Sequence, residues 1–189
     1  LSFPRLYGLL AVKPTRLSQA MHNAGFAALG LSSFYVNFDT SDTKGALSAV
    51  KGLGICGLSL TIPHKEGAFP IVDALDLHAR AIGAINTIIN DGRKLTGFNT
   101  DWIGVVMAFE EAGIDAKNKR VLIIGAGGAA RAAVYAMQNM QAGKVTVYNR
   151  SSERARELAA CFSAEVCELQ MIAEINLYFD IIINCTPVG

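Results

Sequence analysis

Residues 120–130 read RVLIIGAGGAA, an aliphatic run that passes directly into a turn rich in glycine. The run Arg120–Ile124 is apolar at almost every position, which predicts a strand buried on both faces of a sheet. After the turn, Ala130, Val134 and Met137 recur at helical spacing and predict an amphipathic helix. A buried strand, a tight turn and a helix are the repeating unit of a parallel α/β sheet.

The turn itself fits the pattern G-x-G-x-x-G/A. Gly125 allows a tight turn, Gly127 lets the backbone approach a pyrophosphate, and the small Ala130 lets helix and strand pack closely. Between a strand and a helix, this pattern favours dinucleotide binding over the alternative, a glycine turn that only packs a helix on a sheet. The predicted cofactor-binding residues of the turn are Gly125, Ala126, Gly127, Gly128 and Ala129.

The segment after the next predicted strand, Lys144–Tyr148, indicates which dinucleotide binds. An NAD enzyme places Asp or Glu at this strand end, against the ribose 2′-hydroxyl, but residues 149–154 read NRSSER. Two arginines can hold a 2′-phosphate instead, and a serine between them begins a helix. The alternative is an N-cap serine with arginines on a solvated face, which leaves the missing carboxylate unexplained. We therefore predict NADP, bound also by Asn149, Arg150, Ser151 and Arg154.

The rest of the chain repeats the alternation of short apolar runs and helical patterns. Predicted strands of the first half are Leu6–Ala11, Ser33–Asn37, Gly57–Thr61 and Thr87–Asn90, with helices at Ser18–Ala28 and Thr43–Lys51. Later come a helix from Asp101 with Gly113 at its C-terminus, a helix at Ser152–Cys161 and a strand at Asp180–Asn184. The pattern predicts an α/β protein with a mostly parallel sheet.

Two domains are predicted. Residues 1–100 form an α/β substrate-binding domain, and residues 101–189 form a Rossmann-type, doubly wound NADP-binding domain. A whole doubly wound domain has six strands, so we expect this one to be incomplete at its C-terminus. The chain is then expected to be part of a longer protein, and fusion to another domain stays open.

Composition excludes several functional classes. Hydrophobic residues make up 51% and charged residues 17%, too apolar for a disordered chain. The net charge of +1 argues against nucleic acid and against a membrane surface as partners, and no segment predicts a transmembrane helix. The cysteines lack zinc-type spacing, so we predict no metal site, reduced and buried thiols, and a cytoplasmic location. His22 and His64 are interpreted as neutral hydrogen-bonding residues.

Polar side chains interrupt the apolar runs of the first half at three places. Thr61, Lys65, Asn86 and Asp101 lie there, and ligands of open α/β folds collect beyond the carboxyl ends of strands. These four are therefore candidates to converge on a small hydroxylated acid. Each also has a simpler interpretation: an exposed helix lysine, a turn asparagine, or a threonine paired across strands. For Asp101 alone, an N-cap that stabilises a helix by about 0.5–2 kcal/mol is the stronger interpretation.

Taken in order, these segments resemble the shikimate dehydrogenase family, which includes the quinate/shikimate dehydrogenases. The resemblance covers essentially the whole chain. Its motifs are LYG at 6–8, LS at 17–18 with MHN at 21–23, TIPHKE at 61–66, AINT at 84–87, NTD at 99–101, GAGGA at 125–129, NRS at 149–151 and NCTPVG at 184–189.

The resemblance implies reversible reduction of 3-dehydroshikimate to shikimate by NADPH, a step of aromatic amino acid biosynthesis. Lys65 and Asp101 would be the catalytic pair, the lysine transferring a proton at the oxygen whose carbon receives the hydride. Which of the two carries the proton is open. Substrate contacts would come from Ser18, Thr61, Asn86 and Asp101.

The chain departs from the family pattern near the substrate. Where the family shows a Ser-x-Ser-Pro run, this chain reads RLSQ at residues 16–19, and the familiar Asn-Val-Thr is SLT at 59–61. Arg16 could pair bidentately with the substrate carboxylate, block the pocket or point outward. We include Arg16 among the predicted substrate-binding residues.

Three other functions stay open on these residues. One is a dehydrogenase for quinate or for an amino analogue of shikimate, since Arg16 and Ser59 depart from the family. Another is a non-catalytic, cofactor-responsive binding module derived from the family, which the retained Lys65 and Asp101 argue against. The third, an NADP-dependent folate-type dehydrogenase, explains the NRS and NTD motifs less well.

Overall fold

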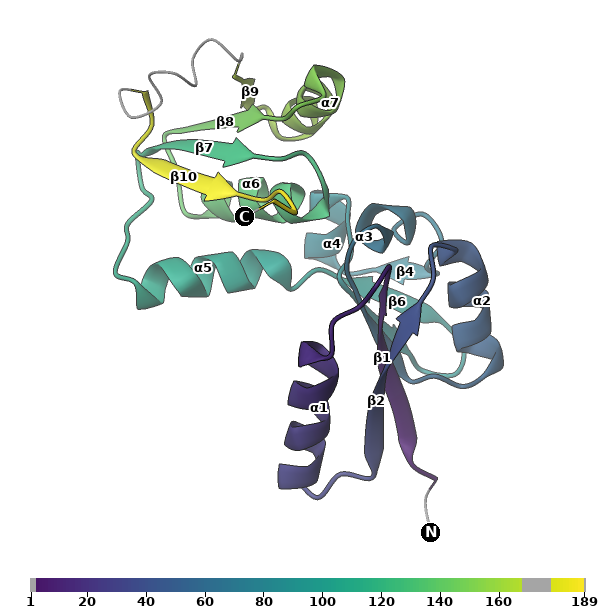
Figure 1. Ribbon diagram of the computed structural model, residues 1–189. Helices are drawn as coiled ribbons and strands as arrows, with labels where there is room; N and C mark the ends of the chain where they lie inside the picture. Colours follow the sequence, from purple (N-terminus) through teal and green to yellow (C-terminus); the bar gives the residue numbers. More distant parts are fainter. Residues whose placement is uncertain (1–2, 168–177, 189) are drawn as a thin grey trace. The chain divides into compact units, whose positions relative to one another are not determined.

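The computed structural model describes residues 3–167 and 178–188 (Figure 1). It divides into two compact units, residues 1–99 and residues 100–189. Each unit has its own β-sheet and its own hydrophobic core. The mixed α/β class predicted from the sequence is confirmed.

The first unit is built on a sheet with the strand order β2-β1-β3-β5-β6-β4. Its strands are β1 (Arg5–Ala11), β2 (Ser33–Asp39), β3 (Gly57–Leu60), β4 (Ala74–Leu75), β5 (Thr87–Asn90) and β6 (Leu95–Phe98). Its helices are α1 (Leu17–Ala28), α2 (Thr43–Gly52), α3 (His64–Gly67) and α4 (Leu77–Ile82). The predicted strands and the two longer predicted helices are all present, each within two residues at either end.

Different helices cover the two faces of this sheet, because successive residues of a strand point to opposite sides. On one face, Leu9 of β1 belongs to a cluster with Tyr35 of β2 and Phe26 of α1. On the other face, Leu10 belongs to a larger cluster that includes Leu47 of α2. Strand β1, which lies between β2 and β3, is thereby covered on both sides.

Most strand pairs of the structure are parallel, as expected from the sequence, and β5 is the exception. This strand pairs antiparallel with both β3 and β6, whereas the other pairs of the sheet are parallel. The physical reason for its antiparallel pairing with β6 is the tight connection between these two strands. The Asp91 carboxylate accepts hydrogen bonds from the N–H groups of Arg93 and Lys94, both 2.9 Å, and Gly92 has φ +87°. Such a turn returns the chain beside the strand it has just left.

The second unit has the strand order β10-β7-β8-β9, with every pair parallel. Its strands are β7 (Arg120–Ile124), β8 (Lys144–Tyr148), β9 (Glu165–Val166) and β10 (Ile181–Asn184), and its helices are α5 (Asp101–Glu111), α6 (Gly128–Asn139) and α7 (Ser152–Phe162). Strands β8 and β9 follow β7 to one side, and β10 lies on its other side. This is half of a doubly wound sheet, as predicted.

Strand β7 is the centre of this unit. Val121 and Ile123 are fully buried in a cluster with residues of α6 and α7, and Leu122 is fully buried on the opposite face beside Cys167 and Phe179. The prediction that β7 is buried on both faces is confirmed.

The cysteines differ from the expectation of buried thiols. Cys167 is buried, but Cys161 is exposed, because it lies on the outward side of α7. None of the four, all within the described residues, forms a disulfide. Among the described residues, we find no helix with the length and apolar character that crossing a bilayer requires.

Candidate functional site

The glycine turn after β7 has a backbone that only glycine adopts readily. Gly125 has φ +120°, and its N–H donates to the carbonyl oxygen of Tyr148 over 2.7 Å. A Cβ atom at this position would lie 3.1 Å from both the carbonyl carbon and the carbonyl oxygen of Cys185, which follows β10. The turn therefore lies between the ends of β7 and β10, where the strand order reverses and where doubly wound folds bind ligands.

Helix α6 begins directly at this turn. Its N-cap, Gly127, has extended backbone and no side chain, so nothing in that residue occupies the first N–H groups of the helix. Ala130 is fully buried, which lets α6 pack closely on the sheet. A helix N-terminus of this kind, with a positive dipole end and open N–H groups, fits the pyrophosphate of a dinucleotide.

The end of β8 carries the residues predicted for the 2′-phosphate. The Asn149 side chain donates to the carbonyl of Ser151 (3.1 Å), and the Ser151 hydroxyl accepts from the N–H of Arg154 (3.4 Å) as the N-cap of α7. The Arg154 guanidinium donates to the carbonyl of Ala126 in the glycine turn, 3.3 Å away. This segment therefore both caps α7, through Ser151, and contacts the glycine turn, through Arg154. No carboxylate stands at residues 149–152, and the first, Glu153, lies inside the helix.

In the first unit, three predicted residues are held together through main-chain hydrogen bonds. The N–H of Ile85 donates to the carbonyl of Lys65 (2.9 Å), and the N–H of Leu60 donates to the carbonyl of Asn86 (2.7 Å). Thr61 follows Leu60, and its N–H donates to β1 over 3.2 Å. Thr61, Lys65 and Asn86 thus lie on neighbouring segments, and all three are partly buried.

Arg16 and Ser18 lie where the loop after β1 leads into α1. Arg16 is the N-cap residue of α1, is exposed, and makes no side-chain cap hydrogen bond. Ser18 lies in the first turn, where its carbonyl accepts from Nδ1 of His22 (2.8 Å). The loop that follows β1 is bonded to the segment after Thr61, since the N–H of Val12 donates to the carbonyl of Ile62 (3.4 Å).

Asp101 is the first residue of α5 and belongs to the second unit. The cap position before it is Thr100, so Asp101 is not the N-cap that the simpler interpretation required. Just before it, the buried amide of Asn99 donates to the carbonyl of Ala84 (3.0 Å). That bond attaches the end of β6 to the segment carrying Asn86. The placement of Asp101 relative to Lys65 stays a prediction.

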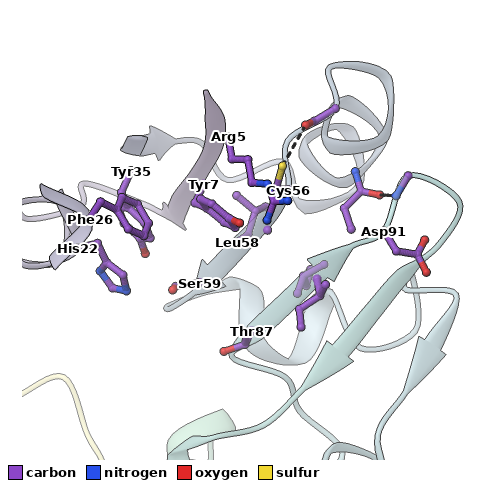
Figure 2. Close-up of a pocket in the computed structure, with 16 residues that line it drawn as sticks. Arg5, Tyr7, His22, Phe26, Tyr35, Cys56, Leu58, Ser59, Thr87 and Asp91 are labelled. Atoms are coloured by element: carbon purple, nitrogen blue, oxygen red, sulfur yellow. Dashed lines mark hydrogen bonds between the residues drawn. The ribbon is translucent and has the colours of Figure 1, made fainter. Parts of the chain in front are cut away.

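Sequence reasoning missed a cavity of about 730 Å³ on the α1 side of the first sheet (Figure 2). Tyr7, Phe26 and Tyr35 contribute to its lining, as do Ser59 and Thr87, which are opposite one another in the register of β3 and β5. The period of two would have placed these side chains on one face, had the strand order been known. Burial raises the pKa of Tyr35, an effect that the Ser59 side chain partly offsets.

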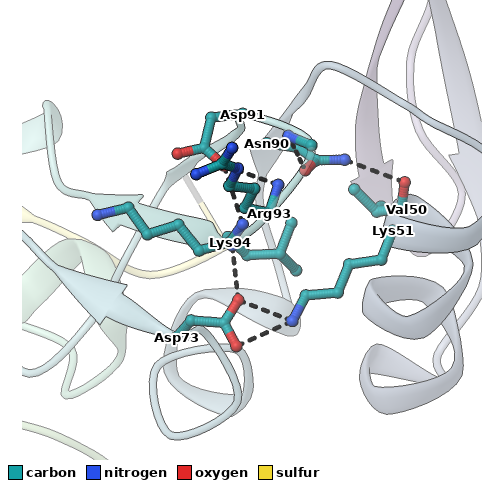
Figure 3. A network of polar contacts seen from close by, with 9 residues as sticks. Val50, Lys51, Asp73, Asn90, Asp91, Arg93 and Lys94 are labelled. Carbon is teal, nitrogen blue, oxygen red and sulfur yellow. Dashed lines mark hydrogen bonds and ion pairs between the residues drawn. The ribbon is translucent and has the colours of Figure 1, made fainter.

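An exposed polar network connects α2 with β6 (Figure 3). The Asp73 carboxylate accepts from Nζ of Lys51 over 2.8 Å and from the N–H of Leu95 over 2.6 Å. The hydrogen bond from Lys51, followed by that from Leu95, holds the pKa of Asp73 below its ordinary value. Beside it, the Asn90 amide donates to the carbonyl of Ile55 (2.9 Å). The network has a structural role, since it involves none of the predicted site residues.

No cluster of three or more His, Cys, Asp or Glu side chains suited to a metal ion occurs in the described ranges 3–167 and 178–188. The residues present fit a dinucleotide, because Gly127 caps α6 without a side chain and so leaves the first N–H groups of the helix to a phosphate.

Comparison with known proteins matches both units. Residues 13–88 match the shikimate dehydrogenase substrate binding domain, and residues 107–188 match the shikimate / quinate 5-dehydrogenase family. A solved structure of shikimate 5-dehydrogenase from Thermus thermophilus, in complex with NADP(H) and shikimate, is 34% identical with a TM-score of 0.83, covering 98% of this chain and 69% of its own. This chain belongs to the shikimate dehydrogenase family. The resemblance stated from the sequence is confirmed.

Two other relatives frame the family's range. Shikimate dehydrogenase (NADP(+)) from Moorella thermoacetica is 41% identical over 184 residues, covering 92% of this chain. A quinate dehydrogenase from Corynebacterium glutamicum, solved in complex with NAD, is 30% identical with a TM-score of 0.86, covering 98% of this chain and 72% of its own. The chain spans 62% of the length of the Moorella relative.

Proposed function

We propose that this chain is part of an NADP-dependent shikimate dehydrogenase, which interconverts 3-dehydroshikimate and shikimate. The observation that carries the proposal is the main-chain bonding of the segments that bear Thr61, Lys65 and Asn86. It gives one sheet end an ammonium, an amide and a hydroxyl, groups suited to a hydroxylated carboxylic acid. A cytoplasmic location, and fusion to a further domain, belong to the same proposal.

NADPH supplies the hydride when it is bound. Lys65 donates a proton to the substrate carbonyl oxygen while the carbonyl carbon receives that hydride, so the ketone becomes a hydroxyl group. Asp101 is the second member of the proposed catalytic pair. The ring hydroxyls are bound by Thr61, Asn86 and Ser18. Arg16, at the N-terminus of α1, pairs its guanidinium with the substrate carboxylate.

The first test is oxidation of shikimate with reduction of NADP+, followed at 340 nm with the full-length protein. In the same assay, Lys65→Ala should lower kcat by about 10²–10⁴-fold, with a smaller change in KM for shikimate. Lys94→Ala, which removes an exposed lysine from the β5–β6 hairpin, is the matched control and should leave kcat unchanged. An unchanged kcat in Lys65→Ala would remove Lys65 from the mechanism.

NADP specificity is assigned to the segment 149–154. Arg150→Ala and Arg154→Ala should raise KM for NADP+ while leaving the weaker use of NAD+ unchanged, because only NADP+ carries the 2′-phosphate. Arg156→Ala is the matched control on the same helix, since that guanidinium donates to the Ser152 hydroxyl 3.1 Å away. A preference of the unmodified enzyme for NAD+ would contradict the assignment.

A second candidate is a dehydrogenase for quinate or an amino analogue of shikimate. Arg16 favours it, because an exposed arginine stands at the start of α1 where the family has serine. A substrate panel separates the two activities. Under this second candidate, Arg16→Ser should shift the kcat/KM ratio toward shikimate, whereas loss of the carboxylate pairing proposed above would lower kcat/KM for shikimate. If the protein binds NADPH but none of these substrates turns over, the non-catalytic binding module becomes the better interpretation.

A further inference from the structure

His64 is the most deeply buried polar side chain of the first unit, with none of its surface exposed. One ring nitrogen contacts the loop before α2, and the other contacts the first residue of that helix. Nε2 lies 2.8 Å from the carbonyl oxygen of Thr40, and Nδ1 lies 2.7 Å from the hydroxyl of Thr43. A carbonyl only accepts, so Nε2 donates, and in the neutral ring Nδ1 accepts from Thr43. This agrees with the interpretation of His64 as a hydrogen-bonding residue.

The loop that holds the ring is itself anchored. The N–H of Thr40 donates to the carbonyl of Ala11 at the end of β1 (3.1 Å). Two residues later, Asp42 caps α2 by accepting from the N–H of Gly45 (2.9 Å). His64 therefore contacts a segment attached both to the central strand and to a ten-residue helix.

The helix that His64 begins is short. α3 is four residues long, too short to be stable without tertiary contacts. Its position depends on the Thr61 carbonyl, which accepts from the N–H of His64 (2.8 Å), and on the Lys65 carbonyl, which accepts from the N–H of Ile85 (2.9 Å). The side-chain bonds of His64 add a further attachment, one residue before Lys65.

We propose that His64 is a positioning residue for Lys65, which acts by fixing the start of α3 against the loop at residues 40–43. The inference rests on the proposed function, in which Lys65 transfers a proton. His64 does not touch the substrate; its two hydrogen bonds restrict the backbone from which the Lys65 side chain projects. A catalytic group displaced by about 1 Å can lose about 10²-fold in rate.

The test compares full-length variants in the shikimate assay. His64→Phe keeps a ring but removes both hydrogen bonds, and it should lower kcat about 10–100-fold with KM for NADP+ unchanged. His64→Gln keeps a donor toward Thr40 and should recover part of the rate. Thr43→Val removes only the Nδ1 partner and should lower kcat less, while Thr43→Ser, which keeps the hydroxyl, should match the unmodified enzyme.

A double-mutant comparison separates positioning of Lys65 from general damage. In a Lys65→Ala background, His64→Phe should change the residual rate by less than about twofold, because the group being positioned is absent. An equal loss in both backgrounds, or full kcat in both His64→Phe and Thr43→Val, would overturn the proposal. If His64→Phe fails to fold, the Thr43 pair carries the same comparison.

Amide hydrogen exchange gives a readout that does not need turnover. In the Thr43→Val and His64→Phe variants, the Ile85 N–H, bonded to Lys65, should exchange faster, while the Asn86 N–H, bonded to Phe98 over 3.0 Å, should not. Unmodified protein without shikimate turnover would refute the proposed function, and the exchange result would still decide whether His64 holds α3. Unchanged protection of Ile85 would overturn the positioning role.

Discussion

Replacement of Gly125 by alanine is the sharpest test of the predicted cofactor turn, because the added Cβ atom brings both backbone strain and a close contact. The backbone has φ +120°, where a residue with a side chain is strained by about 1–3 kcal/mol. The added Cβ would also lie 3.1 Å from two backbone atoms of Cys185, which cannot rotate away. Overpacking of this kind costs about 1–3 kcal/mol. Gly125→Ala should therefore lower the free energy of unfolding by about 2–6 kcal/mol.

Urea unfolding followed by the fluorescence of Trp102 measures this loss. Trp102 is the single tryptophan of these 189 residues and packs edge-on against Tyr135 of α6, with ring centroids 5.4 Å apart. Its signal reports on the unit that contains the turn. The same variant should weaken NADP+ binding at least about tenfold, since relief of the contact must move the backbone that approaches the phosphates.

Gly104→Ala in α5 is the matched control. A Cβ there meets nothing within 4 Å, and alanine is the better helix residue by about 0.5–1 kcal/mol. Gly104→Ala should thus be as stable as the unmodified protein, or slightly more so. The reasoning about Gly125 is refuted if its alanine variant unfolds at the same urea concentration as this control and binds NADP+ normally.

Three other predictions concern stability. Because the pKa of Asp73 is lowered, its contribution to the free energy of unfolding is present above the ordinary value of 3.8 and is lost as the pH falls below it. Asp73→Asn should be less stable than the unmodified protein at pH 7, and urea titrations should show this difference in stability closing at pH 3. A difference that stays constant would contradict the ion pair with Lys51. Because burial raises the pKa of Tyr35, the folded protein favours its neutral hydroxyl, and the stability linked to this is present below the ordinary pKa of 10.0 and is lost at higher pH. Between pH 9 and 11 the unmodified protein should lose stability relative to Tyr35→Phe. Curves of stability against pH that stay parallel for the two proteins would show that this hydroxyl is not buried. Leu122→Ala should cost about 2–5 kcal/mol in chemical denaturation, since Leu122 is fully buried on one face of β7, and a loss below about 1 kcal/mol would indicate a collapsible core.

The longer elements could be predicted from the sequence because their signals are local. β7 and β8 have the predicted bounds, since apolar runs between polar turns leave little freedom in where a buried strand begins. The short elements α3, α4, β4, β6 and β9 were missed. They have two to six residues each, and segments that short are stabilised by the surfaces they pack against rather than by their own pattern.

The candidate site divides in the same way. The glycine turn and the arginines after β8 were found from spacing alone, because the residues that act together there are close in sequence. Nothing local in TIPHKE indicates that Lys65 is bonded to Ile85, twenty residues later, or that the His64 ring contacts Thr40 and Thr43. The cavity beside Tyr35 also escaped prediction, because its lining comes from four strands and a helix.

The amino-acid sequence alone thus determined the α/β class and the family, and it predicted the dinucleotide turn and the preference for a 2′-phosphate. All of these depend on periodicity and on residue types at short spacing. Only the tertiary structure decided that β5 runs antiparallel, that Thr61, Lys65 and Asn86 share one end of a sheet, and that a buried histidine is bonded to the loop before α2. The reason is that hydrogen bonds between residues twenty or more positions apart depend on how the chain packs, and packing follows from the summed burial of many side chains rather than from any one motif.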